Sequence, residues 1–266
     1  MMDASVASSR KSAPGGRMAP ARHRPVIARF LAILSLVLTL LALPDAGTRA
    51  ETGYLAPADL DLTALLALPP AAGGDIEKAE LRTLLDIQST RTDVSAEAAR
   101  ADSTRSVFRF AGVFGNGFTE QALPETKALF RQVAKDTEEI TDAAKMVFQR
   151  TRPFVTEPAL APLLVTPADG SRPTGRTPSY PSGHSAYAAV TSILLANAVP
   201  ERKADIFARG REFAHNRLVA GVHYPSDVEA GWISGTVIAN RLLHDARFQE
   251  DFRKVRAEIR HALALP

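Results

Sequence analysis

Three short groups of residues carry side chains that together could bind and react with an anion. The first is Pro181-Ser182-Gly183-His184, which joins a loop rich in Pro, Gly, Thr and Ser to an apolar run from Ala186 to Ala198. A small-residue turn that leads into a helix presents backbone N–H groups and the positive end of the helix dipole to an anion. Ser182 adds a hydroxyl, Gly183 allows close approach to the backbone, and His184 adds a ring that titrates near neutral pH.

The second group pairs Lys145 with Arg152, which lies seven residues later and directly before Pro153. Two turns of an α-helix take ~7.2 residues, so both cations would project from one helix face. Like charges on one face repel each other unless an anion lies between them. Cations are also favoured near any helix C-terminus, so this pair alone indicates no more than a basic helix end.

The third group is Arg217, His223 and Asp227. The guanidinium of Arg217 could donate to two oxygens of one oxyanion. At a spacing of four residues, the carboxylate of Asp227 could accept a hydrogen bond from one nitrogen of His223 and leave the other as a nucleophile. Alone, this spacing favours the structural interpretation, a helix cap at Asp227 and a buried histidine at His223.

Helices must position these groups, because the sequence contains no strand pattern and no internal repeat. Good helix formers fill residues 75 to about 100. A 3.6-residue apolar period predicts a long helix from about 123 to 149, which Asp136–Thr141 could interrupt. Further helices are expected at 186–198, 201 to about 220, 227–243 and 245–264. Residues 153–182 are expected to form a long irregular loop of the kind that often carries function.

The predicted fold class is therefore all-α, with a single-domain helical bundle over residues 51–266. The net charge of +3 comes from the first 50 residues, which hold seven of the 32 basic and two of the 29 acidic residues. Residues 51–266 then hold 25 basic against 27 acidic residues, a net charge of −2. This balance indicates no polybasic surface for a nucleic acid polymer.

The first 50 residues have the organisation of a secretory signal peptide. Six basic residues between 10 and 29 precede fourteen uncharged residues, 30–43, and Thr48-Arg49-Ala50 offers small residues around a cleavage site. The apolar run is shorter than the ~20 residues that span a bilayer, which favours cleavage over anchoring. We therefore predict a periplasmic or secreted protein without stable membrane insertion after cleavage. The absence of cysteine excludes disulfides and thiolate metal sites.

In this order, Lys-x6-Arg-Pro, Pro-Ser-Gly-His and Arg-x5-His-x3-Asp resemble the three-part motif of the type 2 phosphatidic acid phosphatase superfamily, which also contains the vanadium haloperoxidases. Within it, the chain looks most like the bacterial class A non-specific acid phosphatases, which are exported, soluble, all-helical and metal-independent. The resemblance runs from about Tyr54 to Phe248. Asn216 departs from it, since the family usually has Ser before the arginine, but Asn can still donate a hydrogen bond.

The resemblance implies a role for each candidate catalytic and phosphate-binding residue. His223 would attack phosphorus and become a phosphohistidine, Asp227 would orient it, and His184 would protonate the leaving alcohol and then activate water. The resemblance implies no metal and no cofactor, although vanadate could bind as a phosphate mimic. It also implies a small phosphorylated substrate and a homodimeric assembly. The implied phosphate-binding residues are Lys145, Arg152, Ser182, Gly183 and Arg217.

Three alternatives stay open from the sequence. A vanadium-dependent haloperoxidase would hold vanadate in the same pocket, although the chain is short for that group. A lipid phosphate phosphatase would be tethered by an uncleaved leader. A non-enzymatic anion-binding protein would keep the same fold and bind phosphate without turnover.

Overall fold

The structure is a computed structural model that describes residues 53–164 and 176–266. The predicted signal peptide, residues 1–50, lies outside the described residues. The described residues belong to one compact unit, Thr52–Pro266. Its regular elements are all helices, and neither described range contains a strand. The all-α prediction is confirmed. The longer helices are α2 (Asp75–Ser89), α3 (Asp93–Ala101), α5 (Pro124–Phe148), α7 (Gly183–Ala198), α8 (Lys203–Val219), α9 (Pro225–His244) and α10 (Ala246–Ala262).

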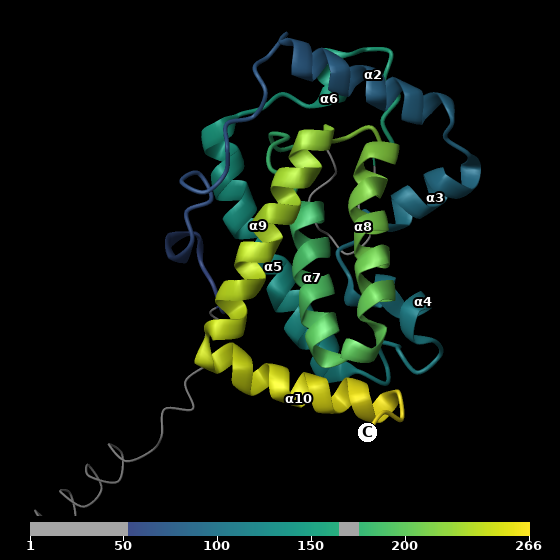
Figure 1. Ribbon diagram of the computed structural model, residues 1–266, viewed down its shortest axis with the longest axis vertical. Helices are drawn as coiled ribbons and strands as arrows, with labels where there is room; N and C mark the ends of the chain where they lie inside the picture. Colours follow the sequence, from purple (N-terminus) through teal and green to yellow (C-terminus); the bar gives the residue numbers. More distant parts are fainter. Residues whose placement is uncertain (1–52, 165–175) are drawn as a thin grey trace, which may run out of the picture. The chain divides into compact units, whose positions relative to one another are not determined.

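Helix α7 is the centre of the bundle, with α5, α8 and α9 packed around it (Figure 1). Its sequence is apolar on every side, and nearly all of its residues are buried. A helix that is hydrophobic all round belongs in a protein core, because it has no face to offer to water. The start of α7 is the turn that carries Ser182, Gly183 and His184.

Helix α9 approaches α7 closely at two glycines one turn apart. A Cβ atom added at Gly231 would collide with the carbonyl oxygen of Ser182, and one at Gly235 with that of Ala186. The contact brings the first turns of α9 against the start of α7, where the backbone N–H of Ser182 donates to the carbonyl oxygen of Asp227 at 2.9 Å. Two of the sequence groups are therefore joined by backbone contacts.

Helices α2 and α10 cross opposite ends of the layer formed by α7, α8 and α9 (Figure 1). The end beneath α2 is the one where α7 and α9 begin and α8 ends. The short elements η1 (Pro57–Asp59), η2 (Val107–Phe110), α4 (Ala111–Phe114), α6 (Pro153–Thr156) and η3 (Pro200–Arg202) complete the chain.

One expected helix is divided in the structure, and the possible break in another does not occur. Residues 75–100 form two helices, because the hydroxyl of Thr92 accepts from the N–H of Ser95 at 3.2 Å and starts α3 anew. Helix α5 is continuous, without a break near Asp136. The carboxylate of Asp136 is buried and accepts from the N–H groups of Tyr54 and Leu55 at 2.7 and 3.1 Å, so it is satisfied without disturbing the helix.

Part of the segment 153–182, expected from the sequence to be irregular, is helical. Helix α6 begins at Pro153, directly after Arg152. Helix α9, outside this segment, also begins at a proline, Pro225, two residues before Asp227. Proline suits the first turn of a helix, because its missing N–H would have no partner there. Residues 165–175 of the loop lie outside the described residues.

Candidate active site

The first turn of α9 brings Asp227 to the ring of His223. Oδ2 of the carboxylate lies 3.3 Å from Nδ1 of the imidazole. The same carboxylate is fully buried and accepts from Tyr224 N at 2.9 Å and from Ser179 Oγ at 2.5 Å. A buried carboxylate with this many donors is fixed in one orientation, and so is the ring that it contacts.

Arg150 is the cationic partner of Asp227. Its Nη1 donates to Oδ1 of Asp227 at 2.6 Å and to Ser226 Oγ at 2.7 Å, and its Nη2 donates to Glu80 of α2 at 2.8 Å. The guanidinium also lies over the ring of Tyr224, 3.8 Å from the centroid. Burial raises the pKa of Asp227, whereas the charge of Arg150 lowers it. Arg150 therefore favours the ionised carboxylate in a buried place.

The partners of His223 assign its tautomer. Nη1 of Arg152 donates to Nε2 of His223 at 2.9 Å, so Nε2 carries the lone pair and Nδ1 carries the proton toward Asp227. Burial holds the pKa of His223 well below its usual value, and the nearby charges of Arg152, Lys145 and Arg217 lower it further. The ring is thus neutral, with its basic nitrogen directed at a cation that an anion could replace.

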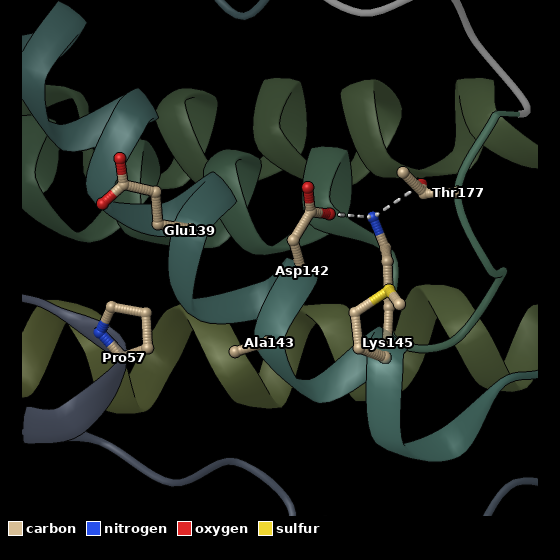
Figure 2. A pocket seen from close by; sticks show the side chains of 7 residues that line it. Pro57, Glu139, Asp142, Ala143, Lys145 and Thr177 are labelled. Atoms are coloured by element: carbon tan, nitrogen blue, oxygen red, sulfur yellow. Dashed lines mark hydrogen bonds and ion pairs between the residues drawn. The ribbon is translucent and has the colours of Figure 1, made fainter.

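Lys145 and Arg152 meet at Thr177. Nζ of Lys145 lies 3.4 Å from Thr177 Oγ1 and 3.0 Å from Asp142, as Figure 2 shows. Arg152 donates to the same residue through Nε, at 2.9 Å from the carbonyl oxygen, and Nη2, at 3.4 Å from Oγ1. Burial lowers the pKa of Lys145 to about 8, although Asp142 acts in the opposite direction. The prediction that both cations project from one helix face is wrong, because α5 ends at Phe148 and Arg152 instead precedes α6. The two side chains nevertheless meet at Thr177.

A pocket of about 440 Å³ opens beside Lys145 (Figure 2). Neither His184 nor His223 is among the residues that line it. Its polar wall comes from one face of α5. The lining residues labelled in the figure are Pro57, Glu139, Asp142, Ala143, Lys145 and Thr177.

The N-terminus of α7 lies at the same point as these cations. Oγ of Ser182 caps the helix by accepting from Ser185 N at 3.3 Å and from Ser185 Oγ at 3.0 Å, which leaves its own hydroxyl hydrogen to donate elsewhere. A Cβ atom added at Gly183 would lie 3.1 Å from Thr141 Oγ1 and 3.7 Å from Nζ of Lys145. Glycine therefore keeps space open between the first N–H groups of α7 and the lysine.

His184 is oriented by a backbone carbonyl. Its Nε2 lies 2.8 Å from the carbonyl oxygen of Ser103, which can only accept, so Nε2 carries a hydrogen and Nδ1 is left for a ligand. Burial holds the pKa of His184 well below its usual value, and the charges of Arg217 and Arg105 lower this pKa further. An anion bound among these cations would raise that pKa again and favour a protonated ring.

Arg217 is fully buried and makes few hydrogen bonds to the described residues. Its Nε and Nη2 have no hydrogen-bond partner among the described residues, and Nη1 reaches the carbonyl oxygen of Ala99 only at 3.5 Å. Burial lowers its pKa to about 10. A buried charge with open donors is costly, which indicates a place built for an anion. Asn216 donates to Asp102 at 2.8 Å, so the expectation that asparagine can donate here is confirmed.

The hydrogen bonds between the three sequence groups, and the effects of their charges on one another's pKa values, place all three at one end of the bundle. Sequence reasoning missed Arg150, Glu80 and Arg105, which come from outside the three groups. Arg150 carried one weak signal, because it stands two residues before Arg152, whereas nothing in the sequence links Glu80 or Arg105 to the site. Within the residues that the structure describes, no group of three or more His, Cys, Asp or Glu side chains is arranged to hold a metal ion.

Comparison with known proteins gives consistent relatives. Residues 135–250 match the PAP2 superfamily. A non-specific acid phosphatase of Salmonella typhi is 32% identical over 199 residues, which cover 72% of this chain and 78% of that protein. A non-specific acid phosphatase of Providencia stuartii is 28% identical, over 80% of this chain and 87% of that protein. Among solved structures, a bacterial vanadium-dependent chloroperoxidase matches with a TM-score of 0.47 at 14% identity, over 68% of this chain and 48% of its own.

Proposed function

This chain belongs to the PAP2 superfamily and is a phosphoric monoester hydrolase, and we propose that it is an exported acid phosphatase that works through a phosphohistidine at His223. The observation that carries the mechanism is the buried guanidinium of Arg217, whose Nε and Nη2 lack a partner within the described residues, near two neutral histidine rings. A tetrahedral dianion would satisfy those donors and compensate the charge.

The phosphate of the substrate would bind among Lys145, Arg152 and Arg217, with the hydroxyl of Ser182 and the N–H of Gly183 as further donors. Phosphoryl transfer needs positioning and charge stabilisation more than covalent help from the protein. Three buried cations and a helix N-terminus supply both in a site from which water is largely excluded. This set takes the part that a divalent cation plays in other phosphatases, which is the basis for proposing a metal-independent reaction.

In the first step, the lone pair on Nε2 of His223 would form a bond to phosphorus as the bond from phosphorus to the ester oxygen breaks. The leaving oxygen would take the proton from Nδ1 of His184 and depart as an alcohol. Asp227 would accept from Nδ1 of His223 and stabilise the charge that develops on that ring. Arg152 would exchange its contact with Nε2 for one with a phosphate oxygen.

In the second step, the now neutral His184 would take a proton from a water molecule. The oxygen of that water would bond to phosphorus while the bond from phosphorus to Nε2 breaks. Inorganic phosphate leaves, and both rings return to their starting states. The same residue thus serves first as acid and then as base, which requires a pKa near the working pH once phosphate is bound.

Export is supported by the composition of residues 1–50, with six basic residues before an apolar run of fourteen. Of the helices in the described residues, none combines the length and apolar character needed to cross a membrane. A small phosphorylated molecule is the expected substrate. The homodimer implied by the sequence resemblance stays a prediction.

The proposal is tested by hydrolysis of an aryl phosphate in the presence of excess EDTA. We expect full activity with EDTA in the wild-type protein and loss of activity in His223→Ala. Inactivation by EDTA with recovery on adding a divalent cation would contradict a metal-independent reaction. Halide oxidation with vanadate and peroxide, without phosphatase activity, would instead identify a haloperoxidase, and phosphate binding without turnover would identify an anion-binding protein.

A further inference from the structure

Asp142 is a carboxylate beside the proposed phosphate site that the mechanism above does not use. It lies on α5 one turn before Lys145, and its Oδ1 is 3.0 Å from Nζ of the lysine (Figure 2). The side chain of Asp142 is 17% exposed, and that of Lys145 is 7% exposed. Water and salt screen a charge pair this little exposed far less than they screen a surface pair. The pair therefore bears on how the lysine meets an anion.

Asp142 helps to orient the ammonium group of Lys145. This group has three hydrogens to donate, and it turns freely about its last bond when nothing holds it. Asp142 accepts one hydrogen, and Oγ1 of Thr177, at 3.4 Å, accepts a second. The third has no acceptor among the described residues. A Cβ atom added at Gly183 would lie 3.7 Å from Nζ, so the third hydrogen can reach an anion at the start of α7.

The charge of Asp142 also stabilises the ammonium form of Lys145. Burial lowers the pKa of Lys145 to about 8, and Asp142 acts against this effect, whereas Arg152 and Arg105 lower the pKa further. Arg152 directly precedes α6, and Arg105 lies between α3 and η2, so cations from two other segments face the lysine. Glu138 of α5 pairs with Arg105 at 2.6 Å, so its charge is taken up by that cation.

Two other ionisable groups near Lys145 do not take the place of Asp142. His223, whose pKa is lowered by the charge of Lys145, is neutral and brings no negative charge. Glu139 lines the same pocket, but it makes no hydrogen bond or ion pair with Lys145, and Figure 2 shows it apart from the lysine. Within the described residues, Asp142 is therefore the carboxylate that holds Lys145.

A carboxylate near an anion site repels the anion, so its place there needs a compensating gain. The gain is a lysine that is already charged and correctly directed before the anion arrives. We propose that Asp142 is a positioning residue for phosphate binding, which acts by holding the ammonium group of Lys145 charged and directed at the anion. This inference rests on the proposed function and adds a residue to its phosphate-binding set.

This role predicts that removal of Asp142 weakens phosphate binding in a pH-dependent way. Asp142 raises the pKa of Lys145, so the ammonium form persists to a higher pH with Asp142 than without it. At acidic pH the lysine is charged in either case, and Asp142→Asn should change the Kd of phosphate only slightly. As the pH rises toward about 8, the variant loses the charge first, and its Kd should rise by about tenfold or more relative to the wild type.

The test measures the Kd of orthophosphate by isothermal titration calorimetry over this pH range in the wild type and Asp142→Asn. Both proteins meet the same phosphate species at each pH, so the ratio of the two Kd values reports the protein alone. The ratio should rise with pH and level off above the pKa of Lys145. Asp142→Glu keeps the charge and should restore the wild-type pH dependence. Asp142→Ala, which suits a helix, should repeat the rise if Asp142→Asn does not fold.

Two controls separate this role from a general effect of charge. Glu139→Gln removes an exposed carboxylate from the same pocket wall and should leave the Kd of phosphate nearly unchanged at every pH. In a Lys145→Met background, Asp142→Asn should no longer weaken phosphate binding at any pH, because the group through which it acts is gone.

A Kd ratio that is the same at every pH, or an equal loss of binding in the Lys145→Met background, overturns the inference. The same pH-dependent loss in Glu139→Gln also overturns it. A wild type that binds phosphate but does not hydrolyse an aryl phosphate overturns the proposed function instead. A wild type that binds no phosphate overturns both.

Discussion

Nη1 of Arg150 lies 2.6 Å from Oδ1 of Asp227, closer than the 3.3 Å that separates Oδ2 of Asp227 from Nδ1 of His223. Asp227 is thus held more closely by Arg150, a residue outside the three sequence groups, than by His223. Arg150 is held in turn by Glu80 at 2.8 Å, and Glu80 accepts from the N–H of Ser226 at 2.6 Å. Helix α2 therefore takes part in fixing the ring of His223, the proposed nucleophile.

Replacing Arg150 should shift the acid limit of activity. Burial raises the pKa of Asp227 and Arg150 lowers it, so Arg150→Met should raise this pKa further. Because Asp227 must be ionised to hold the Nδ1 proton of His223, activity should fail at a higher pH in the variant than in the wild type. The measurement is the pH profile of kcat/KM for an aryl phosphate.

Arg150→Lys is the control for that experiment, since it keeps a positive charge beside Asp227 and should shift the acid limit less. Both variants remove a buried partner, so thermal unfolding must show that they are folded at the assay temperature. A uniform fall in kcat at every pH, with the acid limit unmoved, would contradict the role given to Arg150.

Asp227→Asn should lower turnover by a factor of about 10⁴, by analogy with the effect of a misplaced histidine tautomer in a catalytic triad. The amide has the same shape but cannot accept through both of its terminal atoms, so the proton on His223 is free to move to Nε2. The check is kcat at the pH optimum, with His223→Ala as the reference for complete loss. Retention of a tenth or more of wild-type turnover would argue that Asp227 has another task.

Arg217→Met should abolish activity and yet raise the free energy of unfolding of the phosphate-free protein by about 1 to 2 kcal/mol. The reason is that Arg217 is fully buried, with two nitrogens lacking a partner among the described residues. Phosphate should stabilise the wild type, by about 2.7 kcal/mol at a hundred times its Kd, and the variant much less. Denaturant unfolding with and without phosphate measures both effects.

The control for that variant is Arg209→Met. Arg209 donates to Asp102 at 2.5 Å, so its removal leaves a buried carboxylate with one donor fewer and should destabilise the protein. If Arg217→Met were destabilising to the same degree, the charge of Arg217 would have to be compensated in the phosphate-free state.

The pH dependence of kcat/KM should be that of an acid phosphatase. His184 and His223 both have lowered pKa values, so both are neutral in the free enzyme down to mildly acidic pH. The proton for the leaving group then arrives with the substrate monoanion, which disappears above the second phosphate pKa of about 6. We expect kcat/KM to fall about tenfold per pH unit well above that value. A rate that keeps rising to alkaline pH would exclude His184 as the acid.

The fold class and the three site groups could be predicted because each rests on local signals. The apolar run 186–198 can only be a buried helix, which the structure shows as α7. Gly183 and Pro181 indicate the turn that opens the anion site. Such signals depend on neighbours in the sequence, so one chain is enough to find them.

The missed parts depend on contacts between distant segments. Glu80 lies 70 residues before Arg150, and only the crossing of α2 over the start of α9 brings them together. Arg105 meets Glu138 through the packing of the α3–η2 segment near α5. The continuity of α5 likewise depends on Tyr54 and Leu55, which satisfy Asp136 from 82 and 81 residues away. No periodicity or spacing in the sequence reports such partners.

The central claim is that Nε2 of His223 takes the phosphoryl group. The most direct test is rapid mixing with substrate, quenching under alkaline conditions that preserve phosphohistidine, and mass spectrometry of the peptides. Phosphate on the peptide that carries His223, formed and lost at rates that support turnover and absent in His223→Ala, is the predicted result. Phosphate on another residue, or turnover with no phosphoenzyme at all, would contradict it.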